Sequence, residues 1–146
     1  MSVLTTLRIA GSALTAQRLR MDVTASNVAN AETTRASDGG PYRRASVVFA
    51  PLRMQEATAG AASASKMEAP GGVEVRAVIQ DSGPPREVHD PGHPDADADG
   101  NVAYPNVDLV TEMTDMMAAS RAYEANITII SAIKNMAQRA IDIARL

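Results

Sequence analysis

The sequence predicts a mainly α fold with a small β element: long N- and C-terminal helices that pair as a coiled coil, and a short β-rich middle segment with extended loops. Both ends of the 146-residue chain lack proline and repeat apolar residues at helical spacing. All prolines and all but one of the glycines lie between residues 39 and 105, where turns are expected. Aromatic residues make up only 3% of the chain, so a thick globular core is not expected.

An N-terminal helix is expected from Val3 to about Ala29, because this stretch contains no proline and a single glycine. Its apolar or small residues recur at alternating spacings of three and four residues, which is the pattern of a coiled-coil seam. This seam comprises Leu4, Leu7, Gly11, Leu14, Arg18, Met21, Ala25 and Val28. We expect the helix to end near Asn30, since Asn tolerates the left-handed backbone conformation that often ends helices.

A longer C-terminal helix is expected to start after Pro105, with Asn106 or Asp108 as its N-cap, and to continue to Leu146. Two neighbouring registers of mostly apolar residues run along it at heptad spacing. The first register comprises Leu109, Met113, Met116, Ser120, Tyr123, Ile127, Ile130, Lys134, Ala137, Ile141 and Ala144. The second register, one residue back, comprises Ala119, Ala122, Asn126, Ile129, Ile133, Met136, Ala140 and Ile143.

Together the two registers make an apolar face that is wider than one partner helix can cover. At about 1.5 Å per residue the two helices would be roughly 55 to 60 Å and roughly 40 Å long, which exceeds what a compact domain of this size can bury. We therefore predict that other subunits cover the remainder, because large exposed apolar patches mark interaction sites. The predicted subunit-interface residues are Leu4, Leu7, Leu14, Met21, Val28, Leu109, Met113, Met116, Tyr123, Ile127, Ile129, Ile130, Ile133, Met136 and Ile141.

Two strands are expected in the middle of the chain, over residues 42–49 and 72–79, and the second alternates apolar and polar residues. Residues 55–71 are rich in Ala and Ser and are expected to form a flexible connector. Residues 82–105 contain five prolines and are expected to form an extended loop pinned by turns. The predicted domains are a terminal-helix coiled-coil domain, residues 1–35 plus 105–146, and a small middle segment, residues 36–104.

Composition and charge exclude several protein classes. The chain has no cysteine, which rules out disulfide frameworks, Cys-ligated zinc and thiol nucleophiles. Its net charge is −3, its acidic residues are concentrated between residues 55 and 104, and few aromatic rings could stack bases, so we expect no nucleic-acid binding. No stretch is long and apolar enough for direct membrane insertion. The first twenty residues lack a basic start, so we expect no cleavable signal peptide.

No metal site, cofactor or catalytic residue is predicted. The run Asp95–Gly100 matches the first half of a calcium-binding helix-loop-helix loop, but Asn106 replaces the Glu needed at the twelfth position. We interpret the run as an Asp- and Gly-rich turn. His89 and His93 are four residues apart, but the prolines around them forbid a shared helix. The chain also lacks a nucleophile elbow and a glycine-rich phosphate loop, so we expect no enzyme.

Motifs near both ends resemble the flagellar rod and hook axial proteins. The run Ser26–Thr33, which closes the N-terminal helix, is similar to the N-terminal signature of that family. The run Gly100–Asp108, which continues into Glu112–Met113 and Ala119–Asn126, is similar to the proximal-rod members of the family. The signature residues that carry the resemblance are Asn27, Asn30, Tyr104, Pro105, Asn106, Arg121 and Asn126.

The resemblance implies a structural subunit of the bacterial flagellar basal-body rod, the hollow drive shaft that transmits torque from rotor to hook. It implies as partners other copies of the chain, other rod proteins, the rod adaptor at the membrane ring and the flagellar export apparatus. It also implies export, without a cleavable signal peptide, to a rod that spans the periplasm. The residues alone leave open a soluble coiled-coil adaptor or regulatory binding module and, less strongly, a calcium-binding protein.

Overall fold

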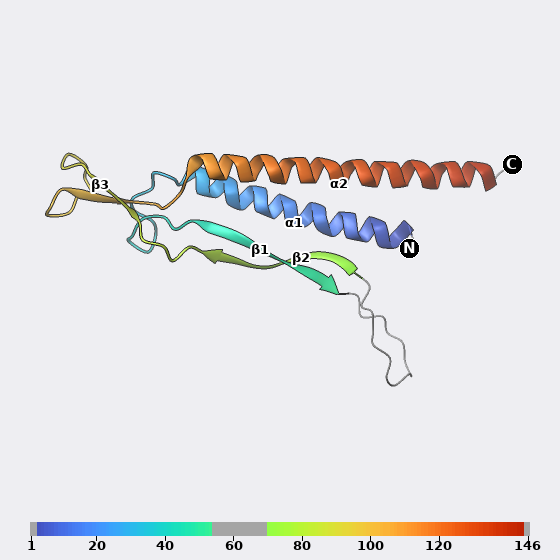
Figure 1. Ribbon diagram of the computed structural model, residues 1–146, viewed down its shortest axis with the longest axis horizontal. Helices are drawn as coiled ribbons and strands as arrows, with labels where there is room; N and C mark the ends of the chain where they lie inside the picture. The colour runs from blue at the N-terminus through green and yellow to red at the C-terminus, as the bar shows by residue number, and fades with distance from the viewer. Residues whose placement is uncertain (1–2, 54–69, 145–146) are drawn as a thin grey trace, which may run out of the picture.

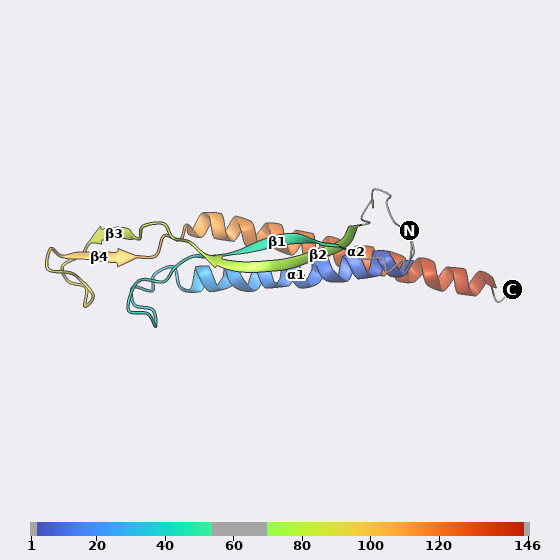
Figure 2. The ribbon, with the colours of Figure 1, turned by 90° about the horizontal axis from the view of Figure 1, so that it is seen from below.

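A computed structural model of the chain describes residues 3–53 and 70–144. Two long antiparallel helices and a pair of antiparallel strands run along the same long axis (Figure 1). The first helix lies between the second helix and the strand pair, and a second, shorter strand pair lies at the end opposite the two termini (Figures 1 and 2). The elements are α1 (Val3–Ala29), β1 (Ala45–Arg53), β2 (Pro70–Gln80), β3 (Arg86–His89), β4 (Asn101–Tyr104) and α2 (Leu109–Ala144). The predicted fold class is confirmed.

α1 ends where the sequence predicts. The backbone N–H of Asn30 and its side-chain Nδ2 both donate to the carbonyl of Ser26, at 3.1 and 2.9 Å. The hydroxyl of Thr33 donates to Asn30 Oδ1 at 3.2 Å. Asn30 therefore supplies a partner for a carbonyl that the last turn would otherwise leave free, and it also holds the turn that follows the helix.

α2 begins at Leu109, and of the two predicted N-caps the structure selects Asp108 rather than Asn106. Asp108 Oδ1 accepts a hydrogen bond from the backbone N–H of Val110 at 3.1 Å, and Oδ2 accepts one from the Thr111 hydroxyl at 2.6 Å. These bonds, with the Thr111 bond as the largest cause, lower the pKa of Asp108 from its ordinary value. The helix start is thus fixed by a charged cap in an exposed position.

β1 and β2 pair over their whole length, with Ala45 opposite Gln80 and Arg53 opposite Pro70. Both strands differ from the predicted ranges: β1 starts three residues later than residue 42 and runs on to Arg53, and β2 already starts at Pro70. A register shift between Val48 and Phe49 bends the pair, as a bulge does. Apart from its last two residues, which belong to β2, the predicted connector 55–71 lies outside the described residues.

The prediction that residues 82–105 form only an extended loop is wrong. Within this range β3 and β4 pair antiparallel, with Arg86 opposite Tyr104 and His89 opposite Asn101. The prolines of the segment all lie outside the paired residues, where they remove no ladder hydrogen bond. The strands are only four residues each, which is too short for an alternating pattern to stand out among the prolines.

The core of the described part of the chain is small. Its buried apolar residues are Ala10, Ala16, Ala31, Val102, Ala119 and Ile133. Its buried polar residues are Thr24, Asn27 and Glu112. Because four of the six apolar residues are alanines, burial within one chain supplies little hydrophobic free energy. Over the residues that the structure describes, no helix is both long and apolar enough to cross a membrane.

Candidate assembly interface

Asn27 joins α1 to two other segments of the chain. Its side chain is only 1% exposed. Its Nδ2 group donates to the carbonyl of Ala45 at 2.8 Å and to Glu112 Oε2 at 2.9 Å. Its Oδ1 atom accepts from the backbone N–H of Ala45 and from the Tyr42 hydroxyl, both at 2.9 Å. All donor and acceptor sites of this amide are therefore used. Because the amide bonds both the N–H and the carbonyl of Ala45, it replaces the backbone partner that a neighbouring strand would supply.

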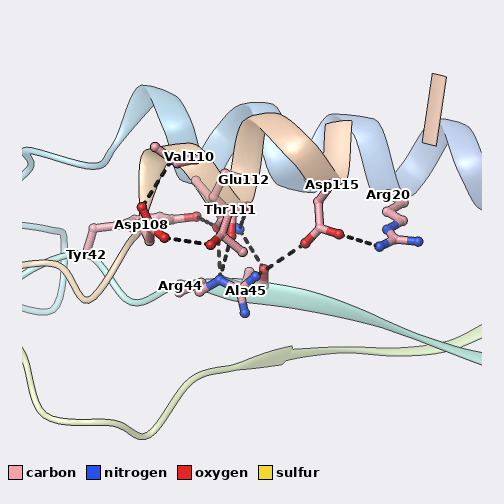
Figure 3. A network of polar contacts seen from close by, with 10 residues as sticks. Arg20, Tyr42, Arg44, Ala45, Asp108, Val110, Thr111, Glu112 and Asp115 are labelled. Carbon is pink, nitrogen blue, oxygen red and sulfur yellow. Dashed lines mark hydrogen bonds and ion pairs between the residues drawn. The ribbon is translucent and has the colours of Figure 1, made fainter. Parts of the chain in front are cut away.

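Charged side chains gather near the start of α2, among them Arg20, Arg44, Glu112 and Asp115 (Figure 3). Arg44 Nε donates to Glu112 Oε1 at 2.6 Å, and the Glu112 side chain is 1% exposed. Asp115 lies between two guanidiniums, 2.7 Å from Arg20 Nη2 and 3.7 Å from Arg44 Nη2. We call this set the polar node; it comprises Arg20, Asn27, Tyr42, Arg44, Glu112 and Asp115.

The polar node contains equal numbers of cations and anions. The guanidinium of Arg44 compensates the desolvation of the buried Glu112 carboxylate. The node's hydrogen bonds and ion pairs join α1, α2 and the start of β1. We interpret the node as a structural element that fixes how these three segments align, rather than as a reacting centre.

One row of α2 side chains faces α1. Residues spaced alternately by four and three positions share one side of a helix. Buried and half-buried residues mark such a row at Glu112, Met116, Ala119, Tyr123, Asn126, Ile130, Ile133 and Ala137. From Met116 onward, successive residues of this row belong in turn to the first and to the second predicted register. Neither register as predicted therefore faces α1 along its whole length.

The predicted seam of α1 is also displaced. Leu4, Arg18 and Ala25 of that seam are exposed. The buried residues of α1 lie outside the seam, at Ala10, Ala16, Thr24 and Asn27. The reason is that α1 is covered on two sides, by α2 and by the β1–β2 pair, whereas a heptad seam describes contact with a single partner.

Two apolar strips of α2 remain uncovered, one on each side of the row that faces α1. The first, the Met113 flank, comprises Met113, Ile127 and Ile141, with Val110 and Met117 beside them. The second, the Ile129 flank, comprises Ile129, Met136 and Ile143. Met113 is 58% exposed and Met136 is 62% exposed. A polar ridge spaced by seven residues separates the flanks on the outer side of α2: Thr114, Arg121, Thr128, Asn135 and Asp142.

The predicted interface residues fall into three groups. Those exposed in the single chain are Leu4, Leu109, Met113, Ile127, Ile129, Met136 and Ile141. Those half-buried are Leu7, Leu14, Met21, Val28, Met116, Tyr123 and Ile130. Ile133 is buried within the chain. The exposed group is available for contacts between subunits, and its role in such contacts stays a prediction.

Two family models match the ends of the chain. A model described as flagella basal body rod protein matches residues 7–36, which cover most of α1 and the turn after it. A model described as flagellar basal body rod FlgEFG protein C-terminal matches residues 98–143, which cover β4 and nearly all of α2. The matched residues thus include most of both long helices and two contacts at their junction, Asn27 with Glu112 and Arg20 with Asp115.

Known relatives match almost the whole chain. The flagellar basal-body rod protein FlgC of Salmonella typhimurium is 45% identical over 136 residues, 93% of each chain. FlgC of Borreliella burgdorferi is 42% identical over 149 aligned residues, 98% of each chain, and FlgC of Bacillus subtilis is 40% identical over 153, 99% of this chain and 100% of its own. The chain belongs to the FlgC family of flagellar basal-body rod proteins. It is a structural subunit of the basal-body rod.

Three of the residues that carry the FlgC resemblance join elements or end them. Asn27 lies at the centre of the polar node, and Asn30 caps α1. Tyr104 ends β4, with the guanidinium carbon of Arg86 5.6 Å from its ring centroid, a cation–π distance. These positions therefore have structural explanations within one chain.

The other signature residues lie at the start of α2 and along it. Pro105 is buried and Asn106 is exposed in the segment before the helix. Asn126 belongs to the row that faces α1 and donates to the carbonyl of Ala122 at 2.8 Å. Arg121 is exposed on the polar ridge. Exposed signature residues such as Arg121 are available to contact other subunits of a FlgC assembly.

The pairing of Arg44 with Glu112 is not predicted from the sequence. A signal for the acid exists, because Glu112 lies four residues before Met116 in a helical row that is otherwise largely apolar, and a charge there needs a buried partner. The sequence does not indicate which basic residue pairs with Glu112. Arg44 is 68 residues away along the chain, and several other arginines would satisfy the same rule.

The Asp-rich turn binds two loops together at the end opposite the termini. Asp95 accepts a hydrogen bond from the Thr34 hydroxyl and pairs with Arg35, each at 2.8 Å. Asp97 Oδ1 accepts from the backbone N–H groups of Asp99 and Asn101, at 2.9 and 2.8 Å. Within residues 3–53 and 70–144, no three His, Asp or Glu side chains are grouped so that they could hold a metal ion.

Proposed function

We propose that this chain acts by packing: copies of it and other rod proteins cover the Met113 and Ile129 flanks of α2, and the assembly transmits torque from rotor to hook. The observation that carries this proposal is the exposure of large apolar side chains along α2 in the single chain. Exposed apolar strips of this length mark interaction surfaces. A structural role rather than a catalytic one follows from this mechanism.

The arrangement of the flanks favours an open assembly. The two flanks lie on opposite sides of the polar ridge and have different residues, so a contact between the Met113 flank of one copy and the Ile129 flank of the next is heterologous. Heterologous contacts generate helical arrays when the rotation does not close a ring. This geometry is compatible with a hollow tube built from many subunits.

We further propose the place of the chain in the flagellum. The coiled-coil domain, residues 1–35 plus 105–146, would form the inner layer of a rod that spans the periplasm, and the middle segment, residues 36–104, would lie outside it. The partners are other copies, other rod proteins and the rod adaptor at the membrane ring. The chain would reach this place through the flagellar export apparatus.

Charged substitutions on α2 test the packing proposal. Met136→Asp and Ile129→Asp place a charge on the Ile129 flank, whereas Asn135→Asp and Thr128→Asp place the same charge one residue away on the polar ridge. Burial of an unpaired carboxylate costs several kcal/mol, so the flank variants should fail to restore motility in a strain that lacks its own copy. The ridge variants should restore it at least in part.

Two measurements complete this test. Circular dichroism of each purified variant checks that α2 still forms, since both flank residues are exposed in the single chain. Recovery of each variant in purified basal bodies checks assembly directly. Equal recovery of the flank and ridge variants would contradict the proposal. Light scattering that shows a fixed small oligomer at rising concentration would instead favour the coiled-coil adaptor.

A further inference from the structure

Within residues 3–53 and 70–144, polar contacts attach the β1–β2 pair to α1 near each end of the pair. At one end Asn27 bonds both backbone groups of Ala45, the first residue of β1. Near the other end the Ser12 hydroxyl accepts from the backbone N–H of Val73 in β2 at 3.1 Å. A two-stranded pair is marginally stable by itself in water. The position of these strands therefore depends on what holds Asn27.

Glu112 holds Asn27 from α2. An ionised carboxylate only accepts hydrogen bonds, so Glu112 Oε2 selects the amide orientation of Asn27 in which Nδ2 points toward α2. That orientation leaves Oδ1 to accept from Ala45 and Tyr42. A reversed amide would direct an oxygen toward the carboxylate and lose these bonds.

We infer that Glu112, acting through Asn27, makes the docking of the β1–β2 pair conditional on the pairing of α1 with α2. When α2 separates from α1, one donor of Asn27 loses its partner and Arg44 loses its carboxylate. The start of β1 is then held by an amide that has lost its buried contact with α2. Glu112 is a positioning residue in this account, because it acts on β1 through Asn27 and through Arg44.

This coupling sets an order of events in the FlgC subunit. The strands dock on α1 only in a chain whose long helices are paired. If neighbours stabilise the helix pair by covering the flanks of α2, as proposed above, the strands are held more firmly in assembled subunits than in free ones; this last step rests on the proposed function. The coupling itself concerns contacts within one chain, so it can be tested on dilute protein that has not assembled.

Hydrogen exchange of the full chain tests the coupling. Peptides from β1, β2 and the first half of α2 report their opening free energies separately. We expect the strand amides to be no better protected than the α2 amides, because separation of α2 releases the strands. Strand amides that stay protected while those of α2 exchange freely would overturn the inference.

Variants of the node make the test specific. Glu112→Gln removes the charge but keeps the side-chain size, and Asn27→Ala removes the amide. Each should reduce strand protection about tenfold or more, the effect expected for losing a hydrogen bond to a charged group. Asn135→Ala is the matched control, since Asn135 is exposed on the polar ridge of α2, and it should leave strand protection unchanged. Strand protection within about twofold of the parent chain in Glu112→Gln would overturn the inference.

A double-mutant cycle separates coupling from general damage. If Glu112 acts through Asn27, the double variant should lose little more strand protection than the larger single effect; additive losses would overturn the inference. Should Glu112→Gln fail to fold, Glu112→Asp keeps the charge but withdraws the carboxylate from Asn27 and decides the matter, with selective loss of strand protection expected. Failure of the packing proposal would appear in basal-body recovery and not in these exchange data.

Discussion

The Glu112 carboxylate lies 2.9 Å from the Asn27 amide nitrogen, although the two residues are 85 positions apart in the chain. The contact brings together the end of α1 and the start of α2, the two regions that family models of rod proteins match. Both side chains are almost completely buried. Changes to this pair should therefore affect folding strongly, and changes to the outer flanks should affect assembly.

Asn27→Asp should destabilise the chain. The new carboxylate would face Glu112 at the distance of a hydrogen bond and could no longer donate to it. We expect a loss of about 3 kcal/mol at pH 7. Urea unfolding measures the loss, with Asn135→Asp on the exposed polar ridge as control; an equal loss in the two variants would contradict the electrostatic explanation.

Gln17→Leu should stabilise the chain. The Oε1 atom of Gln17 is buried and, among the described residues, has no hydrogen-bond partner. Replacing an unsatisfied buried polar group with an apolar one of similar size should add about 1 kcal/mol to the free energy of unfolding. Thermal unfolding measures the gain. Gln138→Leu, on the exposed outer part of α2, is the control and should have no such effect.

Asp108→Ala should weaken the start of α2 above pH 4 but not at strongly acidic pH. The pKa of Asp108 is lowered by its bonds to Thr111 and Val110, so its stabilising effect is present above about pH 4, the ordinary range for Asp. That effect is lost as the pH falls through the lowered pKa. Helicity measured by circular dichroism from pH 7 to pH 2 should show the two chains converging. A constant difference would indicate that the ionised cap is not responsible.

Gly72→Ala should loosen the β1–β2 pair from α1. Gly72 has a backbone φ of 132°, a conformation that residues with a side chain rarely adopt. An added Cβ would also overlap the hydroxyl of Ser12. We expect a loss of about 1 to 3 kcal/mol. Gly40→Ala is the matched control, because an added Cβ there meets nothing within 4 Å. Unfolding by urea compares the two variants, and equal stabilities would show that the close approach at Ser12 is unimportant.

Local properties of the sequence were enough to predict three features: the two long helices, the end of α1 and the two candidate N-caps of α2. Proline content, heptad spacing and capping side chains act within a few residues of one another. The β3–β4 pair escaped prediction because each strand has only four residues, and its pairing depends on a partner across a loop.

The sequence by itself determined that this protein is long, helical and richer in apolar surface than one chain can cover, since periodicity and composition suffice for that. Only the tertiary structure decided which row of α2 faces α1, because α1 is shared between α2 and the strands. It also decided that Arg44 and Asn27, rather than other polar residues, compensate the buried Glu112. Such choices depend on distances between residues far apart in the chain, which the order of residues alone does not specify.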